Sequence, residues 1–265
     1  MHKKLLLLFL ALLLACPAWA QNFAAPVFKI EPRETLPHNP EHFTQGLFFH
    51  QGVLYESTGL YGHSRLVRYA PAYGDGEIEA ETILAETYFG EGAVAAGDQV
   101  YWLTWREHTG FRLEAGTLRE LGRFTYSSEG WGLTFDGDKL IRSDGSDQLH
   151  FHDLNGRQLD SLAVRDGSRP VRGLNELEWV PAHNIVLANV WPTTAIAVIN
   201  LRNGAVLAWL DGSGLEPDRA RFPKADVLNG IALSPDGKSL WLTGKRWPDL
   251  YVVDWPLPGL ETLLP

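Results

Sequence analysis

Short apolar runs and tight turns alternate along most of the chain, and one arrangement of them returns five times. Each copy opens with a polar or aromatic residue, followed in four of the five by glycine, and then by an apolar run. The copies begin at Gln45-Gly46-Leu47, Glu91-Gly92-Ala93, Trp131-Gly132-Leu133, Asn175-Glu176-Leu177 and Asn229-Gly230-Ile231. Their starts are 46, 40, 44 and 54 residues apart. This spacing is typical of four-stranded propeller blades, which take about 40 to 50 residues.

Each copy divides into strands at turns that contain Gly and Asp, such as Ala96-Gly97-Asp98 and Asp136-Gly137-Asp138. These residues supply the positive φ angles that hairpins require. The apolar runs predict second strands over 53–57, 100–105, 140–144, 185–190 and 240–244, third strands over 65–69, 110–113, 148–153, 195–200 and 250–255, and fourth strands over 77–84, 119–126, 157–164 and 205–210.

The fifth copy has no fourth strand of its own, whereas a segment with strand-like alternation, 26–36, precedes the first copy. We expect this segment to complete the last blade, because closing the ring removes the exposed sheet edges that invite aggregation. The prediction is an all-β, five-bladed β-propeller with its last blade closed by the N-terminal strand. It would form one domain over residues 21–265, with few helices.

The first twenty residues have the features of a signal peptide. Lys3 and Lys4 form a basic start, an apolar run covers 5–15, and Ala18-Trp19-Ala20 is a small-x-small cleavage site. We therefore expect an exported protein, periplasmic or secreted. A lipoprotein signal with Cys16 as the lipidated residue is the less favoured alternative, because Pro17 fits poorly after that cysteine. Cys16 is the only cysteine, so cleavage after Ala20 would leave no thiol and no disulfide.

Charge argues against nucleic acid as a partner. The formal net charge is −9, and loss of Lys3 and Lys4 with the signal peptide makes it about −11. The remaining Lys and Arg are scattered singly rather than clustered as phosphate binding requires. No later segment approaches the roughly 20 apolar residues of a transmembrane helix. We expect a soluble monomer.

Candidate chemistry lies where the innermost strands line the channel. The opening residues of the copies predict a ring of Gln45, Glu91, Trp131, Asn175 and Asn229 at one mouth, with Thr58, Trp105, Asp144, Trp191 and Lys245 at a neighbouring level. A single carboxylate among amides and an indole is unusual. Taken one at a time, these residues are better explained as structural residues that lock the blades together, but taken together they favour a functional site.

Several motifs, in order, carry a family resemblance. They are His38-Asn39-Pro40, Phe43-Thr44-Gln45-Gly46-Leu47, Glu56-Ser57-Thr58-Gly59-Leu60-Tyr61-Gly62, Phe89-Gly90-Glu91-Gly92, Leu103-Thr104-Trp105, Gly130-Trp131-Gly132-Leu133, Leu174-Asn175-Glu176-Leu177-Glu178-Trp179, Ala188-Asn189-Val190-Trp191 and Thr243-Gly244-Lys245-Arg246-Trp247-Pro248. The set resembles the glutaminyl-peptide cyclotransferases of the plant and bacterial type, over nearly all of residues 38–255.

The resemblance implies a five-bladed propeller that converts the N-terminal glutamine of peptides or proteins to pyroglutamate and releases ammonia. It implies no required cofactor or metal. By motif, Glu91 corresponds to the acid that transfers protons, and Gln45, Asn175 and Lys245 to polar substrate contacts. The aromatic pocket would consist of Phe43, Phe89, Trp105, Trp131 and Trp191.

These residue types suit the reaction. The substrate's own α-amine attacks its γ-amide carbonyl, so the enzyme needs positioning rather than a side-chain nucleophile. One group that gives and takes protons near neutral pH would serve both the amine and the leaving ammonia. Burial should raise the pKa of Glu91, and Lys245 should lower it. The sequence leaves the balance open.

Two other functions use the same residues. In a calcium-dependent propeller hydrolase of the lactonase kind, Glu91, Asn175 and Asn229 would hold calcium in the channel; in a peptide-binding propeller the pocket would work without turnover. A structural calcium at Asp136-x-Asp138 or Asp144-Gly145-Ser146-Asp147 also stays open, although turn-forming aspartates are favoured. The histidines show no zinc-ligand spacing.

Overall fold

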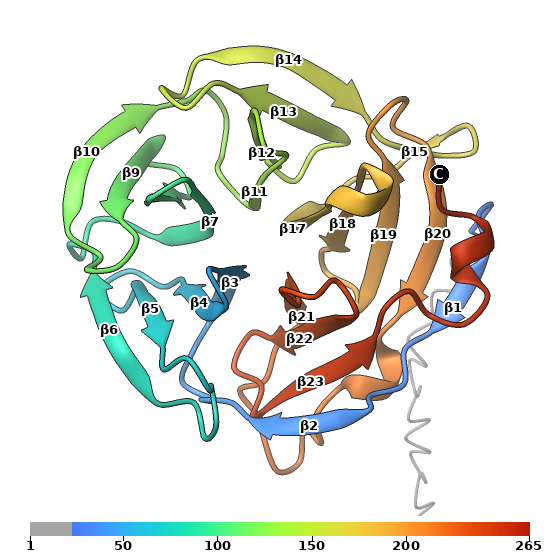
Figure 1. Ribbon diagram of the computed structural model, residues 1–265, viewed down its shortest axis with the longest axis horizontal. Coiled ribbons are helices and arrows are strands. Elements are labelled where there is room, and N and C mark those ends of the chain that lie inside the picture. The colour runs from blue at the N-terminus through green and yellow to red at the C-terminus, as the bar shows by residue number, and fades with distance from the viewer. Residues whose placement is uncertain (1–22) are drawn as a thin grey trace, which may run out of the picture.

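The computed structural model describes residues 23–265, which form a ring of β-sheets around a central axis (Figure 1). The predicted signal peptide, Cys16 and Gln21 lie outside the described residues. The first three blades each have four antiparallel strands. Blade 1 comprises β3 (Thr44–His50), β4 (Val53–Thr58), β5 (Arg65–Tyr69) and β6 (Ile78–Ile83); blade 2, β7 (Gly90–Ala96), β8 (Gln99–Thr104), β9 (Thr109–Glu114) and β10 (Glu120–Thr125); and blade 3, β11 (Leu133–Phe135), β12 (Leu140–Arg142), β13 (Gln148–His152) and β14 (Gln158–Ala163).

The last two blades hold the remaining long strands and both N-terminal strands. Blade 4 comprises β17 (Leu174–Val180), β18 (Ile185–Val190), β19 (Ala195–Asn200), β20 (Val206–Asp211) and β1 (Val27–Lys29); blade 5 comprises β21 (Leu228–Leu233), β22 (Ser239–Gly244), β23 (Asp249–Asp254) and β2 (Glu34–Pro37). A small hairpin of β15 (Arg165–Asp166) and β16 (Arg169–Pro170) precedes blade 4. These sheets confirm the predicted five-bladed, all-β propeller.

The N-terminal segment closes the ring, as predicted, but it does so as two strands rather than one. β2 pairs with β23 antiparallel and completes blade 5, whereas β1 adds in parallel to the outer edge of blade 4. Pro32 lies between the two strands and has no amide hydrogen to donate to a ladder. The segment therefore crosses from one blade to the next at this point (Figure 1).

Apolar side chains fill the space between each pair of neighbouring blades, in five separate clusters. Successive residues of a strand point to opposite faces of its sheet. Leu47 accordingly packs toward blade 5, and its neighbour Phe48 toward blade 2. Both faces of a blade are buried, so the inner strands read as continuous apolar runs rather than as an alternating pattern.

The inner strands approach one another so closely around the axis that three of them need a glycine. A Cβ atom on Gly92 would come within 2.6 Å of the Leu133 nitrogen, and one on Gly132 within 1.9 Å of the Asn175 oxygen. Blade 4 has Glu176 at the equivalent position, and its carboxyl group crosses the channel. It accepts hydrogen bonds from the amides of Leu47 (3.3 Å) and Ile231 (2.9 Å). Glu176 therefore links the inner strands of three blades.

Helical structure is sparse in residues 23–265. It consists of short 3-10 turns, η1 (Pro181–His183), η2 (Ser213–Leu215) and η3 (Leu260–Thr262). Within this part of the chain no helix has the length and apolar character needed to cross a membrane.

The close approach of the inner strands predicts a severe effect of Gly132→Ala. The new methyl group must displace backbone of blade 4, so we expect the variant to lose at least about 3 kcal/mol of unfolding free energy or to fail to fold. Gly116→Ala is the matched control, because a Cβ there meets no atom within 4 Å. Urea unfolding of both variants measures the difference; equal stabilities would contradict the backbone contact.

Candidate active site

The ring residues lie in irregularities of the inner strands. In four blades the register between the first two strands shifts across the opening residue of the repeat, which places Gln45, Glu91, Asn175 and Asn229 at these shifts. Such bulges turn a side chain away from the ladder and are frequent beside active sites. In blade 3 the equivalent residue, Trp131, precedes β11. The fold thus presents one side chain from each blade near the channel mouth.

A cavity of about 400 Å³ lies at this mouth. All nine site residues expected from the sequence line it, together with two that were not expected. The lining residues are Phe43, Gln45, Phe89, Glu91, Trp105, Arg106, Glu129, Trp131, Asn175, Trp191 and Lys245. Side chains separated by up to two hundred residues in the sequence therefore share one pocket.

Three members of the predicted rings do not line the cavity. Asn229 is buried, and its amide nitrogen donates to the Thr44 carbonyl (3.0 Å) and to Gln45 Oε1 (3.3 Å). Thr58 bonds with the backbone of Arg65. Asp144 accepts from the Ser146 amide in a turn and pairs with His150 at 2.9 Å. These side chains act within or between blades, as structural residues do.

Glu91 is the most deeply placed acid of the cavity. It is 5 % exposed, and Oε1 accepts a hydrogen bond from Gln45 Nε2 at 3.0 Å. Burial raises the pKa of Glu91 well above its ordinary value, the positive charge of Lys245 opposes that shift, and the charges of Glu129 and Glu107 add to it. The sequence left open whether burial or the charge of Lys245 has the larger effect on the pKa of Glu91. In the structure the effect of burial is the larger. Burial also lowers the pKa of Lys245.

The aromatic side chains of the cavity form two groups of contacting rings. The rings of Phe43 and Phe89 meet edge to face at 6.2 Å, those of Phe89 and Trp105 at 5.5 Å, and those of Trp131 and Trp191 at 5.9 Å. Lys245 Nζ lies 5.0 Å from the centre of the Phe43 ring. Trp191 is 47 % exposed and forms the rim. This arrangement provides apolar surface for an alkyl chain and room for polar groups beside Glu91.

Glu129 and Arg106 are the two lining residues that sequence reasoning missed. Glu129 accepts hydrogen bonds from the indole nitrogens of Trp105 (2.7 Å) and Trp131 (2.9 Å). The ring of repeat-opening residues contains one carboxylate, Glu91, and the cavity holds a second, Glu129, from the connection that precedes the third repeat. The position of Glu129 two residues before Trp131, in the same connection, is the signal that could have revealed it.

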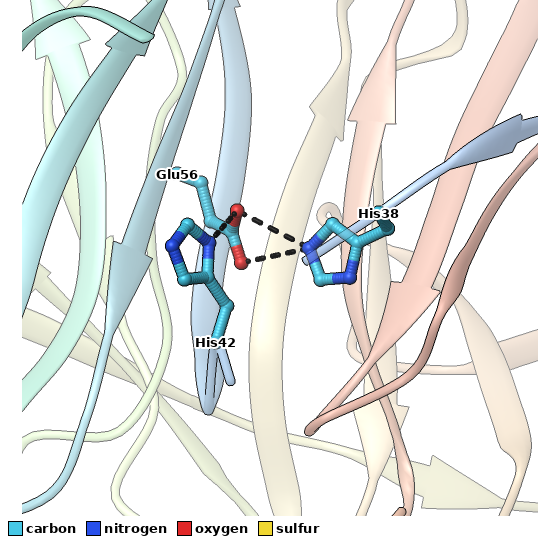
Figure 2. Close-up of side chains that lie close together, drawn as sticks. All are labelled: His38, His42 and Glu56. Carbon is cyan, nitrogen blue, oxygen red and sulfur yellow. Dashed lines mark hydrogen bonds and ion pairs between the residues drawn. The ribbon is translucent and has the colours of Figure 1, made fainter. Parts of the chain in front are cut away.

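Another buried carboxylate, Glu56, lies between two histidine rings (Figure 2). His38 Nε2 lies 3.1 and 3.2 Å from its two oxygens, and His42 Nδ1 lies 2.9 Å from Oε2. The hydroxyls of Thr44 and Tyr69 also donate to it. Burial opposes ionisation of Glu56, but the charges and hydrogen bonds of His38 and His42 hold its pKa well below the ordinary value.

This Glu56 cluster, defined as Glu56, His38, His42, Thr44 and Tyr69, connects the first blade to the last. His38 Nδ1 donates to the Trp247 carbonyl at 2.7 Å, and the Arg246 amide donates to the His42 carbonyl at 2.7 Å. The segment that carries Phe43 and Gln45 is thereby tied to the segment that carries Lys245. The cluster thus fixes both sides of the pocket relative to each other.

The same cluster bears on metal binding. Among residues 23–265, His38, His42 and Glu56 are the set of His, Cys, Asp and Glu side chains whose ligand atoms converge, all within 4.8 Å of one another. However, Glu56 already accepts hydrogen bonds from four side chains. The contacts of this carboxylate are therefore satisfied without a cation.

Fold and site together define a class: five-bladed propellers with a protonatable carboxyl group in an aromatic pocket at the channel mouth. The chain belongs to the glutamine cyclotransferase family, whose model matches residues 5–255. It is 38% identical over 230 residues to the glutaminyl-peptide cyclotransferase of Arabidopsis thaliana. The matched region covers 85% of this chain and 71% of the plant protein. These matches confirm the resemblance inferred from the sequence motifs.

A solved structure supports the same assignment. The crystal structure of Myxococcus xanthus glutaminyl cyclase matches with a TM-score of 0.76 and 32% identity, covering 86% of this chain and 97% of that one. The likeness extends over most of this chain and is accompanied by substantial sequence identity.

The lowered pKa of Glu56 predicts how the cluster contributes to stability as pH changes. A carboxyl whose folded pKa is depressed stabilises the fold above its unfolded pKa of about 4.5, and that contribution is lost as pH falls through the folded value. The raised pKa of His38 adds stability that is complete below about 6.5 and lost as pH rises through its folded pKa. The joint contribution is largest between these limits.

We therefore expect Glu56→Gln to cost about 3 kcal/mol at pH 5.5, because it leaves a buried His38 imidazolium without its counter-charge. The deficit relative to the unsubstituted protein should shrink toward acidic pH. Denaturant unfolding between pH 3 and pH 8 measures both curves. Parallel curves at all pH values would show that the carboxylate charge does not stabilise the fold.

Proposed function

We propose that this protein catalyses the cyclisation of N-terminal glutamine in peptides or proteins to pyroglutamate, with Glu91 as the group that carries protons. The observation that supports this proposal is the state of Glu91, a buried acid with a raised pKa in an aromatic cavity. The names of the plant and bacterial relatives describe the same reaction.

The reaction requires the substrate to fold back on itself. The α-nitrogen attacks the γ-amide carbon, a ring C–N bond forms, and the bond from that carbon to the amide nitrogen breaks. An aromatic wall that holds the glutamine side chain bent would supply much of the rate, since positioning of reacting groups can lower a barrier by several kcal/mol. Phe43, Phe89 and Trp131 are the lining residues suited to this contact.

The polar groups of the cavity match the groups that react. Asn175 Oδ1 is buried and has no hydrogen-bond partner among the described residues, so it can accept from the substrate amide NH₂. Lys245 offers a positive charge to the carbonyl oxygen, which becomes negative in the tetrahedral intermediate. Gln45 already donates to Glu91 and orients its carboxyl group.

Proton transfer then falls to Glu91. In its protonated form it gives a proton to the departing nitrogen, because ammonia leaves far more easily than an amide anion. The resulting carboxylate accepts a proton from the α-nitrogen, which restores the acid. A raised pKa suits both steps, because it makes the carboxyl group a weaker acid and its carboxylate a stronger base.

The calcium-dependent alternative needs Glu91, Asn175 and Asn229 around one ion. Asn229 does not line the cavity, and its amide nitrogen faces Thr44 and Gln45. The cyclase proposal therefore predicts full activity after prolonged dialysis against EDTA. Loss of activity in EDTA and its return with calcium, with an unchanged fold, would favour the alternative.

Substitution of Glu91 by Gln tests the main proposal. The variant keeps a hydrogen-bond partner for Gln45 but cannot carry a proton, so we expect kcat to fall at least about a thousandfold while unfolding stability is retained. Release of ammonia from a Gln-leading peptide, checked by mass spectrometry, measures turnover. Glu261→Gln, on the exposed surface, is the control. Appreciable turnover by Glu91→Gln would reassign the role, and no turnover by the unsubstituted protein would refute the activity.

We also propose that the protein is exported and processed after Ala20, which would expose Gln21 as a substrate of its own activity. Mass spectrometry of the N-terminal peptide of processed protein should then show pyroglutamate. In the Glu91→Gln variant that peptide should cyclise only at the spontaneous rate. A free Gln21 in the active enzyme would contradict either the cleavage site or the self-modification.

A further inference from the structure

The pocket contains two carboxyl groups in opposite electrostatic surroundings. Glu129 lies in the connection before Trp131, and its Oε2 atom accepts from the indole nitrogens of Trp105 (2.7 Å) and Trp131 (2.9 Å). Its Oε1 atom accepts from Arg106 Nε at 3.1 Å. Three donors from pocket-lining residues therefore converge on one carboxylate that itself lines the cavity.

These donors keep Glu129 ionised. Partial burial acts to raise its pKa, but the hydrogen bonds from Trp131, Trp105 and Arg106 outweigh burial and leave the pKa below the ordinary value. The pKa of Glu91 is shifted in the opposite direction, upward, and the negative charge of Glu129 contributes to that rise. When the pKa values of two neighbouring acids are shifted in opposite directions, the two groups can take different roles at one pH.

The substrate of the proposed reaction brings a positive charge to the site. An α-amino group has a pKa of about 8, so at neutral pH a Gln-leading peptide arrives mostly as an ammonium ion. Transfer of that ion into a pocket with aromatic walls is costly unless an anion pairs with it. Glu91, with its raised pKa, is poorly suited to provide the charge, whereas Glu129 is anionic.

We propose that Glu129 is the binding site for the α-ammonium group of the substrate. The inference rests on the proposed cyclase function and names a substrate-binding residue for it. The indole ring of Trp131, which Glu129 holds through its N–H group, adds aromatic surface on which a cation is stabilised, whereas the Arg106 guanidinium already lies over the Trp105 ring. Oε2 accepts from both indoles, whereas Oε1 accepts from Arg106 and keeps a lone pair free for the ammonium.

The proton balance of the reaction is consistent with this arrangement. The α-ammonium group must lose two protons to become the ring amide N–H, and the departing amide nitrogen must gain two to leave as ammonium. The net charge of the pocket is thus the same before and after turnover. Glu91 carries the protons between the two nitrogens, and Glu129 remains anionic and pairs with the cation at either end of the reaction.

Kinetics of Glu129→Gln test the proposal. The amide oxygen of Gln can still accept from an indole, but the charge is gone, so we expect KM for a Gln-leading peptide to rise about tenfold and kcat to change less than about threefold. Loss of the neighbouring charge should also move the Glu91 limb of the kcat/KM profile to lower pH. Glu107→Gln is the matched control: Glu107 also raises the pKa of Glu91 but does not line the cavity. It should shift the profile and leave KM within about twofold.

A binding experiment separates recognition from turnover. The probe is a Met-leading peptide, which lacks the reactive amide, compared at pH 6.5 with the same peptide acetylated at its N-terminus. The unsubstituted protein should bind the free amine about tenfold more tightly, and Glu129→Gln should lose this preference. A purely structural role would weaken both peptides equally.

The possible failures are distinguishable. If the unsubstituted protein does not cyclise a Gln-leading peptide, the proposed function fails, and the peptide preference alone decides the fate of the ammonium site. If the protein cyclises the peptide but Glu129→Gln keeps both its KM and its preference for the free amine, the assignment of Glu129 is overturned.

Discussion

The constraint on which the rest of this structure depends is the close approach of five inner strands around one axis. Gly92 and Gly132 allow backbone to touch backbone, and a methyl group at either position would overlap the next blade. In the fourth blade Glu176 replaces the glycine, and its carboxyl group bonds to amides of the first and fifth blades. Burial raises the pKa of Glu176, which disfavours a negative charge at this bridge in the channel.

The same crowding creates the site. Register shifts next to the close approach turn Gln45, Glu91 and Asn175 out of the ladders and toward the mouth. The side chains of neighbouring blades then surround Glu91 and withdraw it from solvent, which raises its pKa. A packing requirement of the ring and a chemical requirement of the site are thus met by one feature of the backbone.

Closure of the ring gives the pocket its shape. Blades 1 and 5 meet where the chain begins its first repeat and ends its last. The Glu56 cluster joins them there, because His38 contacts Glu56 (Figure 2) and also donates to the Trp247 carbonyl. Phe43 and Gln45 belong to one side of this junction, and Lys245 belongs to the other. The distance between Lys245 and Glu91, and with it the charge balance of the pocket, follows from how this junction is held.

Much of this was readable in the sequence. The number of blades and the strand positions follow from a repeat, because each blade is a local hairpin series whose turns and apolar runs are contiguous in the chain. The full set of nine expected lining residues came from the motifs shared with a known family. The N-terminal closure of blade 5 followed from a missing strand. Its division at Pro32 into β1 and β2 did not, because nothing local identifies the blade with which each half pairs.

What only the tertiary structure decided concerns contacts between segments far apart in the chain. The sequence named Glu91 and Lys245, but the sign of the pKa shift of Glu91 depends on how completely the other blades cover it. The ionised state of Glu129 likewise requires Trp105 and Trp131 to converge on one carboxylate. Desolvation and hydrogen bonding act through space, so a repeat pattern determines which side chains face the channel, whereas the assembled ring determines which of them carry charge.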